Sequence, residues 1–522
     1  MNPLANRTVV IGSRGSDLAL WQAHHVQSQL KELGISTRIE IIKTQGDIIQ
    51  HLSFDKMEGK GFFTKEIEAA LLDKSIDLAV HSHKDLETTS PPGLVVAAVS
   101  ERENPAELLL MHPHAYDPLK PLHLREGAVV GTSAARRKGQ LKMWRSDLQI
   151  KDLRGNVPTR IQKLQRGDYD AILLARAGMT RLELKPEEII IEELDPRWFV
   201  PAPAQGVLAL QAREDDHDLF QALQALNSAE VAADIGRERG VLKQLQGGCQ
   251  VPFGALCSAQ NGSMQYWAFL ANRSGEAPRR VYFTGNPTDF SAEKMLAKLQ
   301  NPRNKCVLVT RTMRPGGTAL RMLEESGCEV TQQSFINIKP LPLDAPDWQK
   351  VDWLFFTSAN AVEHFEYLST KPESVRVAVI GKGTMQRLAD LGIEADFVGL
   401  GSTADVAEVF REELGEGHAL VVCASNGMRT VQRALQPERF TEIHAYQTEE
   451  APVSVKESFD VIAFTSPSNV RAFFTSAELG TNTQCVAIGR ATAREIESRG
   501  YSCTVAWETT EEALADTILG LD

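Results

Sequence analysis

The chain has 522 residues, too many for one hydrophobic core, so several domains of roughly 100–200 residues each are expected. Hydrophobic residues make up 43% and charged residues 24%, the balance of a soluble globular protein. The net charge of −12 disfavours nucleic acid or a membrane surface as the partner of the whole chain. No apolar run approaches the roughly 18–20 residues that cross a bilayer, and the N-terminal segment has no signal-peptide pattern, so we expect a cytoplasmic protein.

Strand and helix patterns alternate along the N-terminal part. The first expected elements are a strand over 7–11, a turn over 12–16, helices over 17–33 and 64–74, and a buried strand over 76–80. The last strand runs into the sequence HSHKD at residues 81–85, and a similar strand, small-residue turn and helix begin at Ala128. Such alternation is typical of βαβ architecture.

Asp85 stands at the carboxyl end of that buried strand. A carboxylate in this place suits acid–base or cation-stabilising work, but an ion pair or a helix cap would explain it equally. His81 and His83 alternate with Asp85 and could share one face of the strand. No further ligand type stands nearby, so no metal site is expected here.

Basic residues recur at or beside the predicted helix starts. Free N–H groups at a helix N-terminus and the planar fork of arginine both favour carboxylates. Taken singly, each basic residue could equally be a solvated or paired surface charge, whereas several that converge on one cleft would bind a polyanion. The residues concerned are Arg14, Lys84, Arg136, Arg137, Arg154, Arg160 and Arg181.

Seven cysteines lie between Cys249 and Cys503 without a C-x-x-C pair. This spacing predicts neither a disulfide framework nor a zinc cluster. Cys249 differs from the others because two glycines precede it and allow a ligand to approach the backbone closely. Its thiol is either a nucleophile or a small core side chain, and the residues alone leave both interpretations open.

Residues 301–304 (NPRN) are predicted to be a linker, and an internal repeat follows it. The tripeptide FTS at 356–358 recurs at 464–466, and the pair IG at 380–381 recurs at 488–489, with the same offset of 108 residues. Two motifs at one offset predict two similar α/β lobes.

Seven motifs in order give residues of about 7–300 a resemblance to hydroxymethylbilane synthase, also called porphobilinogen deaminase. The resemblance implies a dipyrromethane cofactor bound through a thioether at Cys249, and Asp85 as the acid in the condensation of four porphobilinogen molecules. The motifs are GSRGSDLALWQ (12–22), GKGFFTKE (59–66), AVHSHKD (79–85), GTSAARR (131–137), LRGNVPTR (153–160), PAPAQG (201–206) and GGCQVPFG (247–254).

The same resemblance assigns roles to other residues in a carboxylate-binding cleft. The cofactor would contact Arg14, Ser16, Lys84, Thr132, Ser133, Arg136, Arg137, Arg154 and Asn156. The substrate and the growing chain would contact Lys60, Phe63, Arg160 and Arg181. The sequence departs from the common pattern at His83, where methionine is usual, and at Glu87.

Residues of about 303–522 resemble uroporphyrinogen III synthase, which cyclises hydroxymethylbilane. The resemblance rests on the duplicated FTS and IG-x-x-T elements and on HAYQT at 444–448. It implies that Tyr446 assists loss of the substrate hydroxyl group, that Ser358, Ser466 and Thr492 bind substrate carboxylates, and that no metal or cofactor takes part.

The expected fold class is multidomain α/β. Two periplasmic-binding-protein-like lobes and a small α+β domain precede a bilobal part with flavodoxin-like lobes. The first enzyme is expected over 1–302. Its first lobe combines about 5–104 and 204–222, its second lobe covers about 105–203, and its cofactor-anchoring domain covers about 226–300. The second enzyme is expected over 303–522, with one lobe that combines about 303–338 and 450–522 and another over about 341–446.

We therefore expect a bifunctional, monomeric enzyme whose partners are the small molecules porphobilinogen and hydroxymethylbilane. One alternative is a hydroxymethylbilane synthase with a non-catalytic regulatory or interaction module at its C-terminus. Another is a binding protein, because the N-terminal lobes resemble type II periplasmic binding proteins. Asp85 and Cys249 argue against the binding protein.

Overall fold

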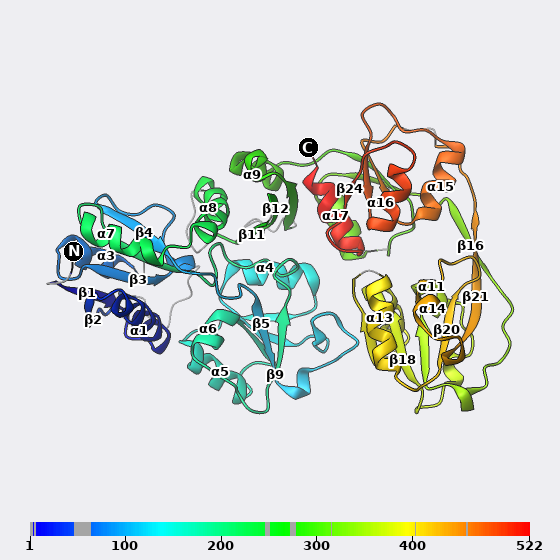
Figure 1. Cartoon of the computed structure of the whole chain (residues 1–522), viewed down its shortest axis with the longest axis horizontal. Helices are drawn as coiled ribbons and strands as arrows, with labels where there is room; N and C mark the ends of the chain where they lie inside the picture. The colour runs from blue at the N-terminus through cyan, green and yellow to red at the C-terminus, as the bar shows by residue number, and fades with distance from the viewer. Residues whose placement is uncertain are drawn as a thin grey trace. The chain divides into compact units, whose positions relative to one another are not determined.

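The computed structural model describes residues 4, 7–45, 64–245, 251–260, 262–271, 278–314, 316–401, 403–455 and 458–521. The chain divides into two compact units, residues 1–116 with 124–301, and residues 302–522 with 117–123. Both units are mixed α/β, in agreement with the predicted class (Figure 1). Within the described residues, no helix is long and apolar enough to span a membrane.

The first lobe of the first unit is a five-stranded mixed sheet in the order β2-β1-β3-β10-β4. Strand β1 is parallel to β2 and β3, and β10 returns antiparallel between β3 and β4. Helix α1 lies along the sheet (Figure 1) and buries Val26 and Leu30 against it. The elements are β1 (Thr8–Ser13), α1 (Asp17–Glu32), β2 (Ser36–Ile41), α3 (Lys65–Leu72), β3 (Leu78–Ser82), β4 (Leu94–Val99), β10 (Leu208–Arg213) and α7 (His217–Leu223).

The strand expected over 76–80 lies two residues later, at Leu78–Ser82. Two interactions explain the shift. Asp77 is held as a loop residue because its carboxylate accepts hydrogen bonds from Arg7 and Arg213, and His81 continues the strand because it pairs with Ala209 of β10.

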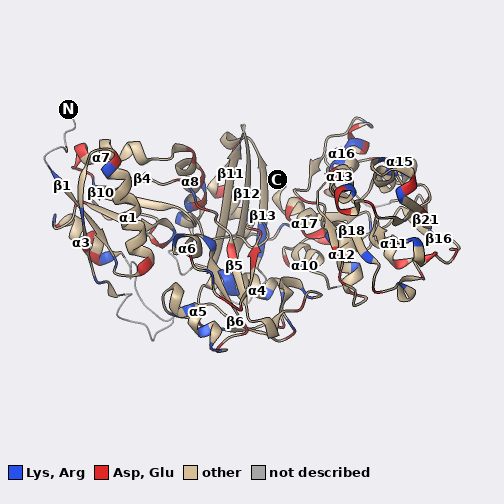
Figure 2. Ribbon diagram, turned by 60° about the horizontal axis from the view of Figure 1, so that its bottom comes forward, with Lys and Arg blue, Asp and Glu red and all other residues tan. Residues whose placement is uncertain are grey.

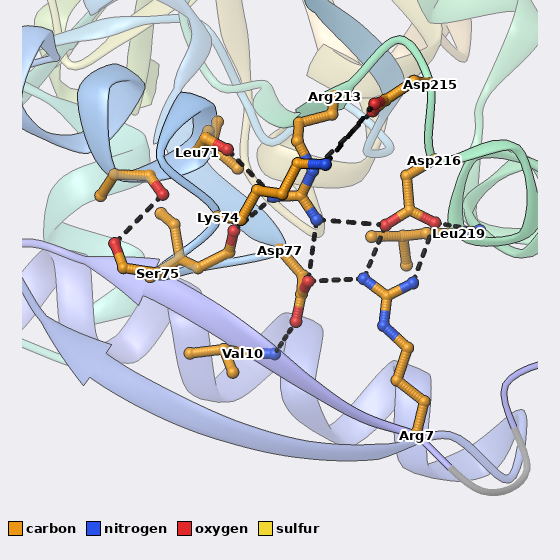
Figure 3. A network of polar contacts seen from close by, with 12 residues as sticks. Arg7, Val10, Leu71, Lys74, Ser75, Asp77, Arg213, Asp215, Asp216 and Leu219 are labelled. Carbon is orange, nitrogen blue, oxygen red and sulfur yellow. Dashed lines mark hydrogen bonds and ion pairs between the residues drawn. The ribbon is translucent and has the colours of Figure 1, made fainter.

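Asp77 belongs to a network that ties four segments of this lobe together (Figure 3). The Arg7 guanidinium donates to both oxygens of Asp216, at 2.9 and 2.6 Å, and to Asp77. The Arg213 guanidinium donates to Asp77 at 2.9 Å and to the backbone oxygens of Leu71 and Ile76. The start of β1, the turn before β3, the end of β10 and the start of α7 are thus fixed by two cations and two anions.

The second lobe is also a five-stranded mixed sheet, in the order β7-β6-β8-β5-β9. Strand β6 is parallel to β7 and β8, whereas β5 is antiparallel to β8 and β9. The elements are β5 (Glu107–Met111), β6 (Val129–Gly131), α4 (Ala135–Trp144), β7 (Gln149–Lys151), α5 (Val157–Gln165), β8 (Ala171–Ala175), α6 (Arg176–Arg181) and β9 (Ile190–Leu194).

Two segments cross between these lobes and pair with each other. The Glu103 amide donates to the Gly206 oxygen at 3.1 Å, and the Gln205 side chain donates to the Pro105 oxygen at 2.7 Å. Gly206 has φ +91°, and a Cβ there would lie 2.1 Å from the Glu103 oxygen. Only glycine fits so close a crossing without displacing backbone.

A smaller α+β domain completes the first unit. Its antiparallel sheet has the order β11-β12-β13, covered by two helices. Glu238 of α8 is fully buried and accepts hydrogen bonds from Arg102, from the Ala204 amide and from the Cys257 amide. It therefore joins both crossing segments to this sheet. The elements are α8 (Ala229–Gln244), β11 (Phe253–Gln260), β12 (Ser263–Leu270), β13 (Arg279–Gly285) and α9 (Ala292–Gln300).

The second unit contains two sheets in which five strands have the same order and pairing. The first has the order β15-β14-β22-β23-β24, and the second has the order β16-β21-β20-β17-β18-β19. Trp353 pairs with Arg376 as Val461 pairs with Gln484, which is the 108-residue offset of the sequence repeat. The two repeated lobes do not follow one another along the chain. The strands of the first sheet come from the beginning and the end of the unit, and the strands of the second sheet come from the sequence between them.

The elements of the first of these lobes are β14 (Cys306–Val309), α10 (Thr318–Glu325), β15 (Glu329–Gln332), β22 (Val461–Phe464), α15 (Pro467–Ser476), β23 (Gln484–Ala487), α16 (Arg490–Glu497), β24 (Thr504–Val505) and α17 (Glu511–Gly520). Those of the second are β16 (Ile336–Pro340), β17 (Trp353–Phe356), α11 (Ala359–Glu363), β18 (Arg376–Ile380), α12 (Gly381–Ala389), β19 (Phe397–Gly399), α13 (Thr403–Leu414), β20 (Ala419–Ala424), α14 (Thr430–Ala434) and β21 (Phe440–Glu450).

Candidate functional site

Lys84 and Asp85 lie in a single 3-10 turn, His83–Asp85, directly after β3. Both side chains are half-buried. The Lys84 ammonium donates to the Gln205 side chain at 3.1 Å, which links the turn to a crossing segment. Burial lowers the pKa of Lys84 to about 8, although Asp85 and Glu107 act in the opposite direction. The turn therefore presents a carboxylate beside a cation that is poorly neutralised.

Arg239 of α8 holds the backbone of the turn in place. Its guanidinium donates to the backbone oxygens of His83 at 3.0 Å, Leu86 at 3.2 Å and Glu87 at 2.6 Å. One planar group thus fixes three carbonyls around Asp85. Sequence reasoning missed Arg239, because nothing in its helical context marks a partner more than 150 residues away.

Arg136 and Arg137, at the start of α4, share one buried acid. Glu107 is fully buried, and its carboxylate accepts from Arg136 at 2.5 Å and from Arg137 at 2.7 and 3.1 Å. Burial acts to raise the pKa of Glu107, but the two guanidinium groups, Arg137 foremost, lower it to about 2. The arginines also donate to the backbone oxygens of Val200 and Leu173. Glu107 is a second residue that sequence reasoning missed.

Arg154 and Arg160 flank the start of α5. The Arg160 Nε donates to the Gly155 oxygen at 2.8 Å, and the side chain is half-buried. Burial, followed by Arg137 and Arg154, lowers its pKa to about 10, although Asp85 acts in the opposite direction. Because Asp85 acts on both Lys84 and Arg160, the turn of the first lobe and the arginines of the second lobe belong to one electrostatic site.

Seven charged side chains make up this group, which we call the cation cluster. Its members are Lys84, Asp85, Glu107, Arg136, Arg137, Arg154 and Arg160. Five cations face two carboxylates, so a net positive charge remains among half-buried and buried groups. Blue ribbon marks lysine and arginine beside α6 and near β5 in Figure 2. A site of this kind attracts small molecules that carry several carboxylates.

The other predicted residues of the first unit have mainly local partners. Ser16 caps α1 by accepting from the Ala19 amide, and Asn156 caps α5 by accepting from the Thr159 amide. The Ser133 hydroxyl both donates to the Leu153 oxygen and accepts from its amide, and Thr132 is buried beside it.

Arg14 and Arg181 are predicted site residues that do not belong to the cation cluster. Arg14 is half-buried and close enough to His81 to lower the pKa of that buried ring, which burial brings to about 4. Arg181 is buried, lies over the Trp21 ring and donates to the Gly206 oxygen at the crossing. The predicted residues Lys60, Phe63 and Cys249 lie outside the described residues.

In the second unit, the structure brings two of the four predicted residues together. The hydroxyl oxygens of Tyr446 and Ser358 lie 2.9 Å apart, and Ser358 also caps α11 by accepting from the Ala361 amide. Tyr446 is 6% exposed, and burial raises its pKa. Ser466 and Thr492 belong to the other lobe, where Ser466 caps α15 and Thr492 is buried in α16.

Fold and charge together define an α/β protein whose first unit gathers five cations around two carboxylates. Residues 9–221 match the family model "Porphobilinogen deaminase, dipyromethane cofactor binding domain", and residues 232–299 match "Porphobilinogen deaminase, C-terminal domain". Residues 318–516 match "Uroporphyrinogen-III synthase HemD". The chain belongs to the porphobilinogen deaminase family and carries in addition a part that matches uroporphyrinogen III synthase. The families that the motifs indicate are thereby confirmed.

Two porphobilinogen deaminases are similar to the first unit. The porphobilinogen deaminase of Syntrophomonas wolfei is 45% identical over 272 residues, which are 52% of this chain and 87% of that protein. That of Oceanobacillus iheyensis is 42% identical over 290 residues, which are 55% of this chain and 92% of that protein. The solved uroporphyrinogen-III synthetase of Helicobacter pylori is 18% identical, covers 40% of this chain and 96% of its own, and has a TM-score of 0.32.

Proposed function

We propose that this chain catalyses two consecutive steps of tetrapyrrole biosynthesis. The first condenses four porphobilinogen molecules to hydroxymethylbilane with release of ammonia, and the second cyclises hydroxymethylbilane to uroporphyrinogen III with inversion of ring D. Family models for both enzymes match separate stretches of the chain and support this assignment. The lobes of the first unit, with a returning antiparallel strand in each sheet and two crossing segments, support a periplasmic-binding-protein-like arrangement.

The observation that carries the first activity is the cation cluster around Asp85. Pyrrole substrates of this pathway bear acetate and propionate groups, and the excess of cations suits them. Asp85 would protonate the leaving amine of porphobilinogen, and its carboxylate would then stabilise the cation left on the substrate. Arg137, Arg154 and Arg160 would hold the substrate carboxylates while Asp85 acts in each cycle.

The cluster also fits a dipyrromethane cofactor. Burial and neighbouring arginines lower the pKa values of Lys84 and Arg160, and the carboxylates of a bound dipyrrole would favour the charged forms of both groups. Cys249 would hold the group through its sulfur, and Arg136, Arg137 and Lys84 would bind its carboxylates. When bound, it supplies the pyrrole carbon to which the first substrate is joined.

The mass of the intact protein tests the first assignment. Purified active protein should exceed the sequence mass by two linked pyrrole rings, and Cys249→Ser should lack the excess while keeping its fold. Cys257→Ser is a matched control, because that cysteine is buried in β11 and should leave the added mass unchanged. An unmodified mass in active protein would overturn the cofactor assignment.

For the second activity, the pair of Tyr446 and Ser358 supports a role in loss of the substrate hydroxyl group. A buried tyrosine with a raised pKa keeps its proton and can donate it as a hydrogen bond. The uroporphyrinogen isomer formed from porphobilinogen tests this activity. We expect isomer III from the intact chain and a shift toward isomer I in Tyr446→Phe. Isomer I alone from the intact chain would favour a non-catalytic C-terminal module.

A further inference from the structure

We propose that β20 and β21 of the second unit carry a site for a zinc-class divalent cation, with Cys423, Glu442 and His444 as its ligands. The inference is independent of the proposed function. Among the described residues, these three side chains bring one thiol sulfur, one carboxylate oxygen and one imidazole nitrogen within 4.8 Å of one another. Thiolate, imidazole and carboxylate are the donors that zinc takes in proteins.

The strands explain how residues about twenty positions apart meet. Cys423 pairs in register with His444 on the neighbouring parallel strand, and Glu442 precedes His444 by two residues on the same face. The Glu442 Oε1 lies 3.2 Å from the Cys423 sulfur and 3.2 Å from the His444 Nε2. Ligand atoms around one zinc ion at normal bond lengths lie roughly 3.3–3.6 Å apart, so small side-chain adjustments admit the ion.

The surroundings orient the carboxylate and leave one side open. Arg429 donates to Oε2 of Glu442 at 2.6 Å, which turns Oε1 toward the other two ligands. The buried Gln432 donates to Oε1 at 2.9 Å and lies 3.4 Å from the sulfur. The Cys423 side chain is buried, whereas His444 is 46% exposed, so an ion enters from the side of the imidazole. Such outer contacts are typical of metal centres.

The other lobe of the second unit shows that the fold itself does not require these residue types. Strand register places Arg311, Gln332 and Ser334 at the positions that correspond to the three ligands. There the Gln332 side chain accepts from the Met313 amide at 2.7 Å and thus fixes a loop. The two lobes therefore differ in chemistry at these positions, and among the described residues only the lobe built from residues 336–450 has three ligand types together.

Binding has a simple proton balance. Without the ion, the Cys423 thiol keeps its proton and donates a hydrogen bond to the Glu442 carboxylate. When the ion binds, a metal–sulfur bond replaces the S–H bond and the proton leaves to solvent. The carboxylate and the neutral imidazole bind through lone pairs, so no oxidant or reductant takes part.

Cobalt(II) serves as the probe, since a thiolate ligand gives it a near-ultraviolet charge-transfer band that zinc displaces. Full-length protein, stripped with a chelator and dialysed, should bind one equivalent and show the band. Cys423→Ser should lose the band, and His444→Ala and Glu442→Gln should weaken binding by about 10–100-fold. Cys485→Ser, a buried cysteine of β23 in the other lobe, should match the unchanged protein.

Circular dichroism and thermal melts check that each variant folds. Glu442→Gln is the mildest of them, because glutamine already stands at the corresponding position of the other lobe. Absence of a thiolate–cobalt band in the unchanged protein would overturn the proposal. So would a band that survives in folded Cys423→Ser, since another cysteine would then be the ligand.

Discussion

The first unit contains two arginine–carboxylate networks that differ in their charge balance. At the centre of the network of Figure 3, Arg7 and Arg213 face Asp77 and Asp216, two cations against two anions, and the exposed pair of Lys74 and Asp215 lies beside them. In the cation cluster, five cations face Asp85 and Glu107. The two networks therefore differ in stoichiometry, and they also differ in burial: the Arg7 side chain is 34% exposed, whereas those of Arg136 and Arg137 are 6% and 8% exposed.

The pKa values of the charged groups differ between the two networks. In the balanced network, hydrogen bonds with Asp216 and Asp77 raise the pKa of Arg7, and the pKa values of both carboxylates are lowered despite their burial. In the cation cluster, burial, with the neighbouring arginines as a smaller cause, lowers the pKa values of Lys84 and Arg160 instead. A balanced network stabilises the fold, whereas an unbalanced one keeps positive charge ready for anionic ligands.

The largest effect is expected at Asp85. Asp85→Asn removes the proton donor and keeps the shape, so porphobilinogen consumption should fall by about 10²–10⁴-fold. The melting temperature should stay within a few degrees. Asp215→Asn, an exposed carboxylate beside the balanced network, is the control and should keep full activity. Near-normal turnover by Asp85→Asn would remove this residue from the mechanism.

Glu107→Gln should cost the most stability, about 3–5 kcal/mol, because it leaves two buried guanidinium groups without their carboxylate. Asp77→Asn is the matched change in the balanced network. It should cost less, since Asp216 still faces both arginines there. Urea unfolding of both variants measures the difference, and equal losses would contradict the contrast between the networks.

Arg239→Gln tests whether positioning of the turn matters for catalysis. Loss of the bonds to three carbonyls should lower kcat by about 10–100-fold and leave KM within about threefold, because the cations that bind substrate are untouched. Arg237→Gln, two residues away and paired with Asp234, should change neither constant. A raised KM at unchanged kcat would assign Arg239 to substrate binding instead.

The smallest effect concerns pH. The pKa of Lys84 is about 8 in the folded protein and about 10.5 when unfolded, so the unfolded chain binds more protons between these values and stability rises with pH across that window. In Lys84→Met, the free energy of unfolding should lack this rise, which amounts to roughly 1 kcal/mol or more between pH 7.5 and 10. The carboxylates of both networks act in the same direction at lower pH, because their pKa values are lowered as well: their contribution is present above about pH 4 and is lost on acidification.

Sequence patterns predicted the α/β class, the repeat and both families, because strand and helix periods and ordered motifs are local signals. The sequence did contain a signal from which the role of Glu107 could have been predicted. It opens a strand that is otherwise apolar, and a buried acid in such a run requires a cation. Arg239 and the group of Cys423, Glu442 and His444 gave no signal, because their contacts arise from packing between segments or strands with no fixed spacing. The roles assigned to the site residues of both units, Asp85, Cys249 and Tyr446 among them, stay predictions.

The split lobe of the second unit has a consequence for its synthesis on the ribosome. Strand β14 pairs with β22, and Cys306 and Asp460 at their starts are 154 positions apart. At roughly 5–20 residues per second, β14 waits about 8–30 s for this neighbour, while the whole inserted lobe can already fold. The lobe with the candidate metal ligands is therefore completed first. A chain that stops before residue 461 would keep that lobe and leave β14 and β15 without the rest of their sheet.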